Sequence, residues 1–192
     1  SEDGVYSIRM GELNPAYKYR LSINWNGKEY KSEYLSPLDT PAIDSISVES
    51  PASEKPVYIC VTTHDNEPEP TYYKWSYREI WEFNADLFAN AGYLNDKFYM
   101  FERHTSQNTY YCWGRDSSKV MLLATTDKLT ENLIYEKKLI EIPRDHDKLK
   151  ILYYIEVKQN RIRKGAYAYF ENMQRNIEQA GSIFSPIPAE MR

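Results

Sequence analysis

The sequence predicts a mainly β protein of two parts that ends in a single α-helix, and three patterns carry this prediction. Apolar and polar residues alternate in several segments between residues 17 and 157, which is the period of a β-strand with one buried face. Prolines cluster at the boundary near residue 40, where they interrupt regular structure. Near residue 165 the period changes to that of an amphipathic helix.

The clearest local unit is a β-hairpin at residues 16–34. Its first strand places apolar residues at alternate positions, namely Tyr17, Tyr19, Leu21, Ile23 and Trp25. Asn26 and Gly27 follow, a pair that readily adopts the positive φ angles of a tight hairpin turn. Residues 28–34 are therefore expected to return as the second strand.

The turn at residues 13–15, followed by Tyr17 or Tyr19, is similar to the tyrosine corner of immunoglobulin-like and fibronectin type III sandwiches. Only about three strands fit before Pro37, whereas such a sandwich needs about seven. We therefore expect residues 1–38 to be the C-terminal strands of a truncated immunoglobulin-like β-sandwich, so that the chain begins partway through that domain.

A second, antiparallel β-rich domain is predicted at residues 39–192, after a linker with prolines at positions 37 and 41. Its strands are expected at residues 43–48, 57–61, 72–83, 98–102, 109–113, 120–124, 133–142 and 150–157. One helical turn is expected at residues 86–91, closed by Gly92.

One helix is predicted at about residues 165–180. Apolar residues recur there at helical spacing, namely Ala166, Phe170, Met173 and Ile177. Gly181 is a natural stop residue for a helix, and residues 182–188 are expected to follow as an extended tail that docks on the domain.

The segment at residues 72–83 holds six aromatic residues in twelve positions. Five of them share one strand face, because they occupy odd positions: Tyr73, Trp75, Tyr77, Trp81 and Phe83. Twelve extended residues span about 40 Å, roughly twice the usual strand length, and Ile80 beside Trp81 breaks the alternation. A bulge or bend is therefore expected near residues 79–81.

Four residues are candidates for ligand binding. Trp81 and Phe83 form the second half of this aromatic row, Glu79 lies on the same strand face, and Trp113 belongs to a later strand. Flat rings offer a large contact area to a sugar or a peptide, although aromatic residues on one strand face also mark a buried core. A bulge would turn Glu79 to solvent, whereas burial would require a partner or a raised pKa, which is one route to general acid chemistry.

No catalytic residue is assigned, and the chain is expected not to be an enzyme. The sequence has no Gly-x-Ser-x-Gly motif and no glycine-rich phosphate loop, and Glu79 has no acidic partner at a determinable distance. Two polar clusters, at residues 64–67 and 145–147, lack the spacing of zinc or calcium sites and are interpreted as solvated loops. No metal and no cofactor is predicted.

The charge of the chain restricts the kinds of partner that it can bind. The net charge is −4, which gives no electrostatic footprint for nucleic acid. The only basic cluster lies at residues 158–164, either as a solvated connection or as a surface for an anionic partner or lipid headgroups. No run of about eighteen apolar residues is present, so no membrane-spanning helix is predicted.

Cys60 and Cys112 are compatible with one disulfide or with two packed thiols.

Several short segments occur in the order associated with one family of bacterial proteins. They are the aromatic series 72–77, the segment 111–113, the stretch 157–159 leading into the helix 166–170, the segment 181–186, the hairpin 19–32 and the run 41–46. On these segments the chain resembles the domain-of-unknown-function family 4249 over nearly its whole length. Arg163, Lys164 and Gly165 depart from that pattern, where similar proteins open the helix with a Ser or Thr cap.

The resemblance implies a lipoprotein of Gram-negative bacteria, attached to the cell outer membrane by an upstream lipid anchor that residues 1–192 do not contain. Genes of such proteins often neighbour TonB-dependent outer-membrane transporters. The expected function is non-enzymatic assistance of nutrient uptake through binding of a glycan or peptide ligand or of the transporter. A structural or adhesive cell-surface module and a glycan-active enzyme are the two alternatives.

Overall fold

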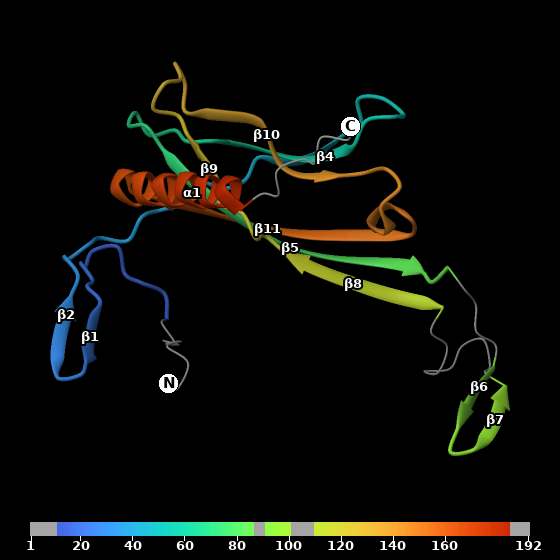
Figure 1. Ribbon diagram of the computed structural model, residues 1–192. Helices are drawn as coiled ribbons and strands as arrows, with labels where there is room; N and C mark the ends of the chain where they lie inside the picture. Colours follow the sequence, from blue (N-terminus) through green and yellow to red (C-terminus); the bar gives the residue numbers. More distant parts are fainter. Residues whose placement is uncertain (1–10, 87–90, 101–109, 185–192) are drawn as a thin grey trace. The chain divides into compact units, whose positions relative to one another are not determined.

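The computed structural model describes residues 11–86, 91–100 and 110–184, which are drawn in colour in Figure 1. It confirms a mainly β chain with several small antiparallel sheets and one C-terminal helix. The chain divides into two compact units, Ser1–Thr40 and Pro41–Arg192.

The first unit is built on the predicted hairpin. Strands β1 (Ser22–Trp25) and β2 (Lys28–Lys31) pair antiparallel, and φ is 50° at Asn26 and 74° at Gly27. These two positive angles match a type I′ turn, which follows the right-handed twist of the strands. The side chains of the hairpin are mostly exposed, including Trp25.

The predicted tyrosine corner has its characteristic hydrogen bond. The backbone N–H of Asn14 donates to the Tyr19 hydroxyl at 3.0 Å, and that hydroxyl donates to the Asn14 carbonyl at 3.3 Å. The backbone of Tyr19 also pairs with Leu35. Among the described residues of this unit β1 and β2 are the only strands, so the immunoglobulin-like sandwich stays a prediction.

The second unit contains a four-stranded sheet, which we call the central sheet. Strand β5 (Tyr72–Asn84) pairs along one edge with β11 (Leu152–Ile162). Its other edge is shared by β8 (Tyr111–Ser117) and β9 (Leu122–Thr125), each covering one half. Figure 1 shows β5 between β11 and β8.

A three-stranded sheet contributes to the same core. It consists of β3 (Ser45–Glu49), β4 (Val57–His64) and β10 (Leu133–Ile142), with β4 in the middle. Side chains from both sheets form one buried cluster, namely Ile59, Val61, Tyr73, Trp75, Ile134, Leu139, Ile140 and Ile142. The odd-numbered face of β5 is therefore the core face in its first half, as the alternation predicted.

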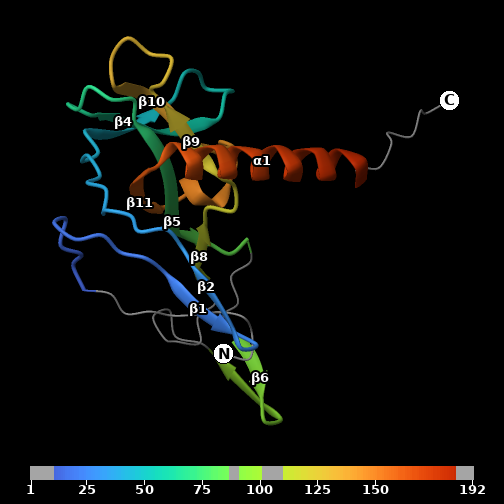
Figure 2. The ribbon, with the colours of Figure 1, turned by 90° about the vertical axis from the view of Figure 1, so that its left-hand side faces the viewer.

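The remaining elements are a short hairpin, a 3-10 turn and the helix. Strands β6 (Ala91–Leu94) and β7 (Lys97–Met100) form the hairpin, and η1 (Asp147–Leu149) precedes β11. Helix α1 (Lys164–Phe184) follows β11 and lies beside the central sheet in Figures 1 and 2.

Several boundary predictions were wrong. The helix continues through Gly181 to Phe184, because glycine permits a helix end without imposing one. Gly92 lies in β6, so it does not close a helical turn. Parts of the predicted turn at 86–91, of the strand at 98–102 and of the tail at 182–188 lie outside the described residues.

The expected bulge in β5 was also wrong. The pairing of β5 with β11 continues without a register shift from the pair Glu82–Leu152 to the pair Tyr72–Ile162. A strand of 13 residues is stable here because its partner is almost equally long, at 11 residues. The odd and even faces of β5 therefore remain distinct along its whole length.

Candidate functional site

Glu79 lies at the centre of a buried polar cluster on the odd face of β5. It is 1% exposed, so the expectation that it turns to solvent was wrong. One carboxylate oxygen pairs with the Lys148 ammonium, and the other accepts a hydrogen bond from the Tyr153 hydroxyl at 2.7 Å. The continuous strand register keeps Glu79 on the core face, and the two partners neutralise and satisfy its carboxylate.

The same carboxylate changes the titration of its aromatic neighbours. Burial, followed by the hydrogen bond to Glu79, raises the pKa of Tyr153 far above its ordinary value. Burial and the negative charges of Glu79 and Asp116 also raise the pKa of Tyr77. Both phenols therefore stay protonated to a higher pH than an ordinary tyrosine, and Tyr153 remains a hydrogen-bond donor to Glu79.

Trp81 closes one side of this cluster. Its ring lies against the backbone of Gly114, where an added Cβ would come within 2.2 Å of the indole. The Lys148 ammonium lies 4.8 Å from the centre of the ring, and the His146 ring meets it edge-on at 6.2 Å. With a glycine backbone, a lysine and a histidine around it, Trp81 is a packed, half-buried residue.

The four candidate ligand-binding residues do not form one site. Glu79 and Trp81 share the Lys148 ammonium as a neighbour. Phe83 is half-buried on the same face of β5, opposite Cys112. Trp113 lies opposite Glu82, on the even face of the sheet, and is 61% exposed.

The even face of the central sheet carries a strip of exposed apolar side chains. It consists of Ile80, Trp113, Leu152 and Tyr154, and we call it the apolar strip. The strand register places Leu152, Glu82 and Trp113 in one row across the sheet, and Tyr154, Ile80 and Arg115 in the next row. Side chains in neighbouring rows of one face lie close enough to form a continuous surface.

Helix α1 contacts the same face at its other end. Tyr167 of the helix packs on Tyr72, with ring centres 5.3 Å apart, and the Lys74 ammonium lies 4.1 Å from the centre of the Phe170 ring. The apolar strip lies at the opposite end of β5, six or more residues beyond Lys74. Its side chains are between 44% and 61% exposed.

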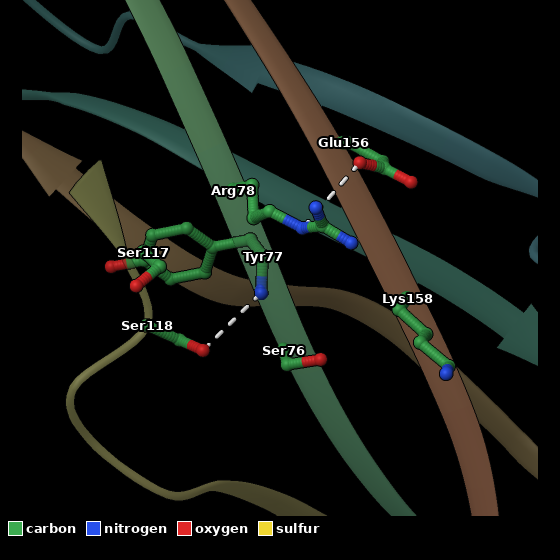
Figure 3. Close-up of a pocket in the computed structure, with 7 residues that line it drawn as sticks. All are labelled: Ser76, Tyr77, Arg78, Ser117, Ser118, Glu156 and Lys158. Carbon is green, nitrogen blue, oxygen red and sulfur yellow. Dashed lines mark hydrogen bonds and ion pairs between the residues drawn. The ribbon is translucent and has the colours of Figure 1, made fainter. Parts of the chain in front are cut away.

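A polar hollow of about 320 Å³ lies between the helix contacts and the apolar strip, and Figure 3 shows it in close-up. It is lined by Ser76, Tyr77, Arg78, Ser117, Ser118, Glu156 and Lys158, which come from β5, β11 and the end of β8. The Arg78 guanidinium reaches toward the Glu156 carboxylate at 3.8 Å. The Ser118 hydroxyl accepts a hydrogen bond from the Tyr77 backbone at 3.3 Å. The even face is therefore divided into a polar half and an apolar half.

Lys148, Tyr153 and Gln159 are the important residues that sequence reasoning missed. Lys148 lies in a turn without periodicity, so no pattern points to it. Tyr153 follows from the register, since odd residues of β11 face odd residues of β5. The Gln159 amide accepts a hydrogen bond from the Trp75 indole at 2.7 Å and donates to Thr63 and to the Pro41 carbonyl, both at 2.9 Å. It thereby connects both sheets to Pro41, the first residue of the second unit.

The two polar loop clusters serve structural roles. Asp65 accepts a hydrogen bond from Thr71 at 2.7 Å and pairs with Arg161 at 3.2 Å, with its side chain only 7% exposed. His146 caps η1 by accepting a hydrogen bond from the Lys148 backbone at 3.1 Å. Within the described ranges, no three His, Cys, Asp or Glu residues are grouped so that they could hold a metal ion.

The predicted basic cluster at residues 158–164 is divided among three places. Lys158 lines the polar hollow, Arg161 pairs with Asp65, and Lys164 lies 3.8 Å from Asp127. Side chains that are close in the sequence are separated here because they alternate between the two faces of β11, and because Lys164 already belongs to α1.

Neither cysteine forms a disulfide, so the thiol alternative is the one observed. Cys60 is fully buried in β4, where burial and the nearby Glu49 raise the pKa of its thiol. Cys112 is half-buried in β8. In the part of the chain that the structure describes, no helix combines the length and the apolar character needed to cross a membrane.

Comparison with known proteins gives one match. The family model described as a domain of unknown function (DUF4249) matches residues 1–192. No curated protein and no solved structure matches the chain.

Proposed function

Since the chain belongs to the DUF4249 family of unknown function, we propose that it is a non-enzymatic binding protein of the bacterial outer membrane whose apolar strip docks a protein partner. The proposed partner is a TonB-dependent transporter, and the proposed role is assistance of nutrient uptake. Attachment to the membrane is through a lipid anchor upstream of Ser1.

The exposed apolar strip is the observation that carries this proposal. Large contiguous apolar surfaces are uncommon on the outside of proteins that work alone, and they mark contact sites for partners. Aromatic residues such as Trp113 and Tyr154 contribute much of the binding energy of protein interfaces when they become buried. Two charged residues share these rows, since Glu82 lies between Leu152 and Trp113 and Arg115 lies beside Ile80.

The state of Glu79 supports a non-enzymatic role. A general acid must reach a substrate, whereas Glu79 is 1% exposed and engaged by Lys148 and Tyr153. The neighbouring Asp116 is held by Lys119 and by the Ser117 backbone, and these bonds lower the pKa of its carboxyl group. Neither carboxylate is placed as a free catalytic acid.

Two alternatives make different predictions. A structural or adhesive module would use the apolar strip against another surface protein, without a transporter. A glycan-active enzyme would require two carboxylates on either side of a cleft, about 5 to 10 Å apart. For the first unit we retain the immunoglobulin-like sandwich as a proposal, which the hydrogen bonds between Tyr19 and Asn14 support.

A pull-down from outer membranes tests the proposed function. The bait is the chain itself, compared with the double variant Trp113→Ser, Tyr154→Ser and with the control Tyr135→Ser. Tyr135 is 69% exposed on β10, so its substitution removes a similar aromatic side chain from a different sheet. We expect a TonB-dependent transporter to copurify with the chain and with the control, and to fall at least about tenfold with the double variant.

Two results would contradict the proposal. One is the absence of any TonB-dependent transporter from the material bound to the unmodified chain. The other is equal recovery of the transporter with the double variant, which would show that the apolar strip is not the contact. Recovery of a different surface protein, lost in the double variant, would favour the adhesive module.

A further inference from the structure

The polar hollow on the even face offers a set of groups that the proposed protein contact does not use. Its two cations are Arg78 and Lys158, and its one carboxylate is Glu156. Within the described part of the chain, no ion pair or hydrogen bond engages the Lys158 side chain. The Arg78 and Glu156 groups are 3.8 Å apart and largely exposed, which makes their interaction weak.

Two serines add groups that both donate and accept hydrogen bonds. Ser76 lies beside Lys158 on the neighbouring strand, and Ser117 lies beside Arg78. In Figure 3 these residues surround one hollow, with Arg78 and Glu156 on one side and Ser118 on the other. The Ser118 hydroxyl is already used by the Tyr77 backbone, so it fixes one wall.

We propose that the polar hollow binds a small hydroxycarboxylate, a molecule with one carboxylate and several hydroxyl groups. Lys158 and Arg78 bind the carboxylate, because charge-assisted hydrogen bonds from ammonium and guanidinium groups are the strong ones. Ser76, Ser117 and the Glu156 carboxylate bind the hydroxyl groups of the ligand. This site is separate from the apolar strip and does not depend on the proposed protein contact.

Charge and size define the ligand class. Two cations and one carboxylate leave a single excess positive charge, which matches a monoanion better than a polyphosphate. A hollow of about 320 Å³ is at the lower end of small-molecule sites, which suits a ligand of six carbon atoms or fewer. The charged and hydroxyl groups of the lining residues give such a ligand its polar partners.

The experiment is a titration of the isotope-labelled chain with sodium gluconate, followed by the backbone amide signals in NMR. Sorbitol is the neutral control, since it has the same number of carbon atoms and carries a sixth hydroxyl group in place of the carboxylate. Ionic strength is held constant with sodium chloride, because surface charges are screened by salt. We expect saturable shifts at residues 76–78, 117–118 and 156–158, with a dissociation constant on the order of 1 mM, and none with sorbitol.

A matched pair of variants tests the role of the charge. Lys158→Gln should weaken gluconate binding at least about tenfold, since it removes one charge-assisted hydrogen bond. Lys128→Gln removes an exposed lysine from a loop outside the hollow, so it should leave binding unchanged. As a control for folding, the amide spectra of both variants should match that of the unmodified chain outside the substituted site.

Three outcomes would overturn the proposal. They are the absence of saturable shifts with gluconate, equal shifts with sorbitol, and equal loss of binding in the two lysine variants. None of them bears on recovery of a transporter through the apolar strip.

Discussion

At the scale of single residues, the environment of Glu79 decides what chemistry the central sheet can perform. The same carboxylate would be a candidate acid in an open cleft, but Lys148 and Tyr153 convert it into a structural anchor for the turn before β11. Burial of this ion pair costs desolvation energy for both charged groups. Removal of one of the two partners therefore leaves the other charge buried and uncompensated.

The variant Glu79→Gln should lower the free energy of unfolding by about 3 kcal/mol, because it leaves the Lys148 ammonium, 12% exposed, without its counter-charge. Urea unfolding followed by tryptophan fluorescence measures the change. The control Glu156→Gln removes an exposed carboxylate from β11 and should cost less than about 1 kcal/mol. Equal effects of the two variants would refute the anchoring role.

Asp65 should make the stability of the chain depend on acid pH. Burial alone would raise the pKa of its carboxyl group. This effect is outweighed by hydrogen bonds from Thr71 and the Glu67 backbone and by the charges of Arg161 and His64, so the pKa is lower than the ordinary value of 3.8. The stabilisation is therefore fully present above about pH 5 and is lost as pH falls through the lower pKa of the folded state.

The variant Asp65→Asn tests this dependence. It should be less stable than the unmodified chain at pH 7. The difference should shrink as pH falls below 4 and through the lowered pKa of Asp65, because the protonated carboxyl group is uncharged like the amide. Unfolding curves at several pH values check the prediction, and a difference that stays constant down to pH 2 would contradict it.

At the scale of secondary structure, strand and helix positions followed closely from the sequence, whereas boundaries and irregularities did not. Alternation predicted β5 and the burial of Tyr73 and Trp75 in its first half. The absence of a bulge depends on β11, a strand about 80 residues away, so the sequence of β5 alone could not reveal it. The face on which Trp113 lies could not be predicted for the same reason, because it depends on the pairing register of β8 with β5.

Two glycines in different surroundings predict opposite effects of substitution by alanine. Gly114→Ala should destabilise the chain by about 1 to 3 kcal/mol, since its Cβ would lie 2.2 Å from the indole. Gly165→Ala, in the first turn of α1, meets no atom within 4 Å and should stabilise by about 0.5 kcal/mol. Thermal unfolding of both variants provides the measurement. A neutral Gly114→Ala would contradict the packing of Trp81 on Gly114, and destabilisation by Gly165→Ala would contradict the open space beside the first turn of α1.

At the scale of the whole molecule, the second unit gives its two sheet faces different roles. The odd face of the central sheet joins the core in its first half and encloses the Glu79 cluster in its second. The even face is covered by α1 at one end and continues through the polar hollow to the apolar strip. Sequence reasoning identified the aromatic face and the family, while the binding surface emerged only from the pairing of three strands.

Site-specific photo-crosslinking in intact outer membranes tests the docking role of the apolar strip most directly. A photoreactive phenylalanine analogue replaces Tyr154 in the strip or, as the control, Tyr135 on β10. We predict a crosslinked adduct that contains a TonB-dependent transporter from position 154 and none from position 135. No transporter adduct from position 154, or the same adduct from both positions, would contradict the account.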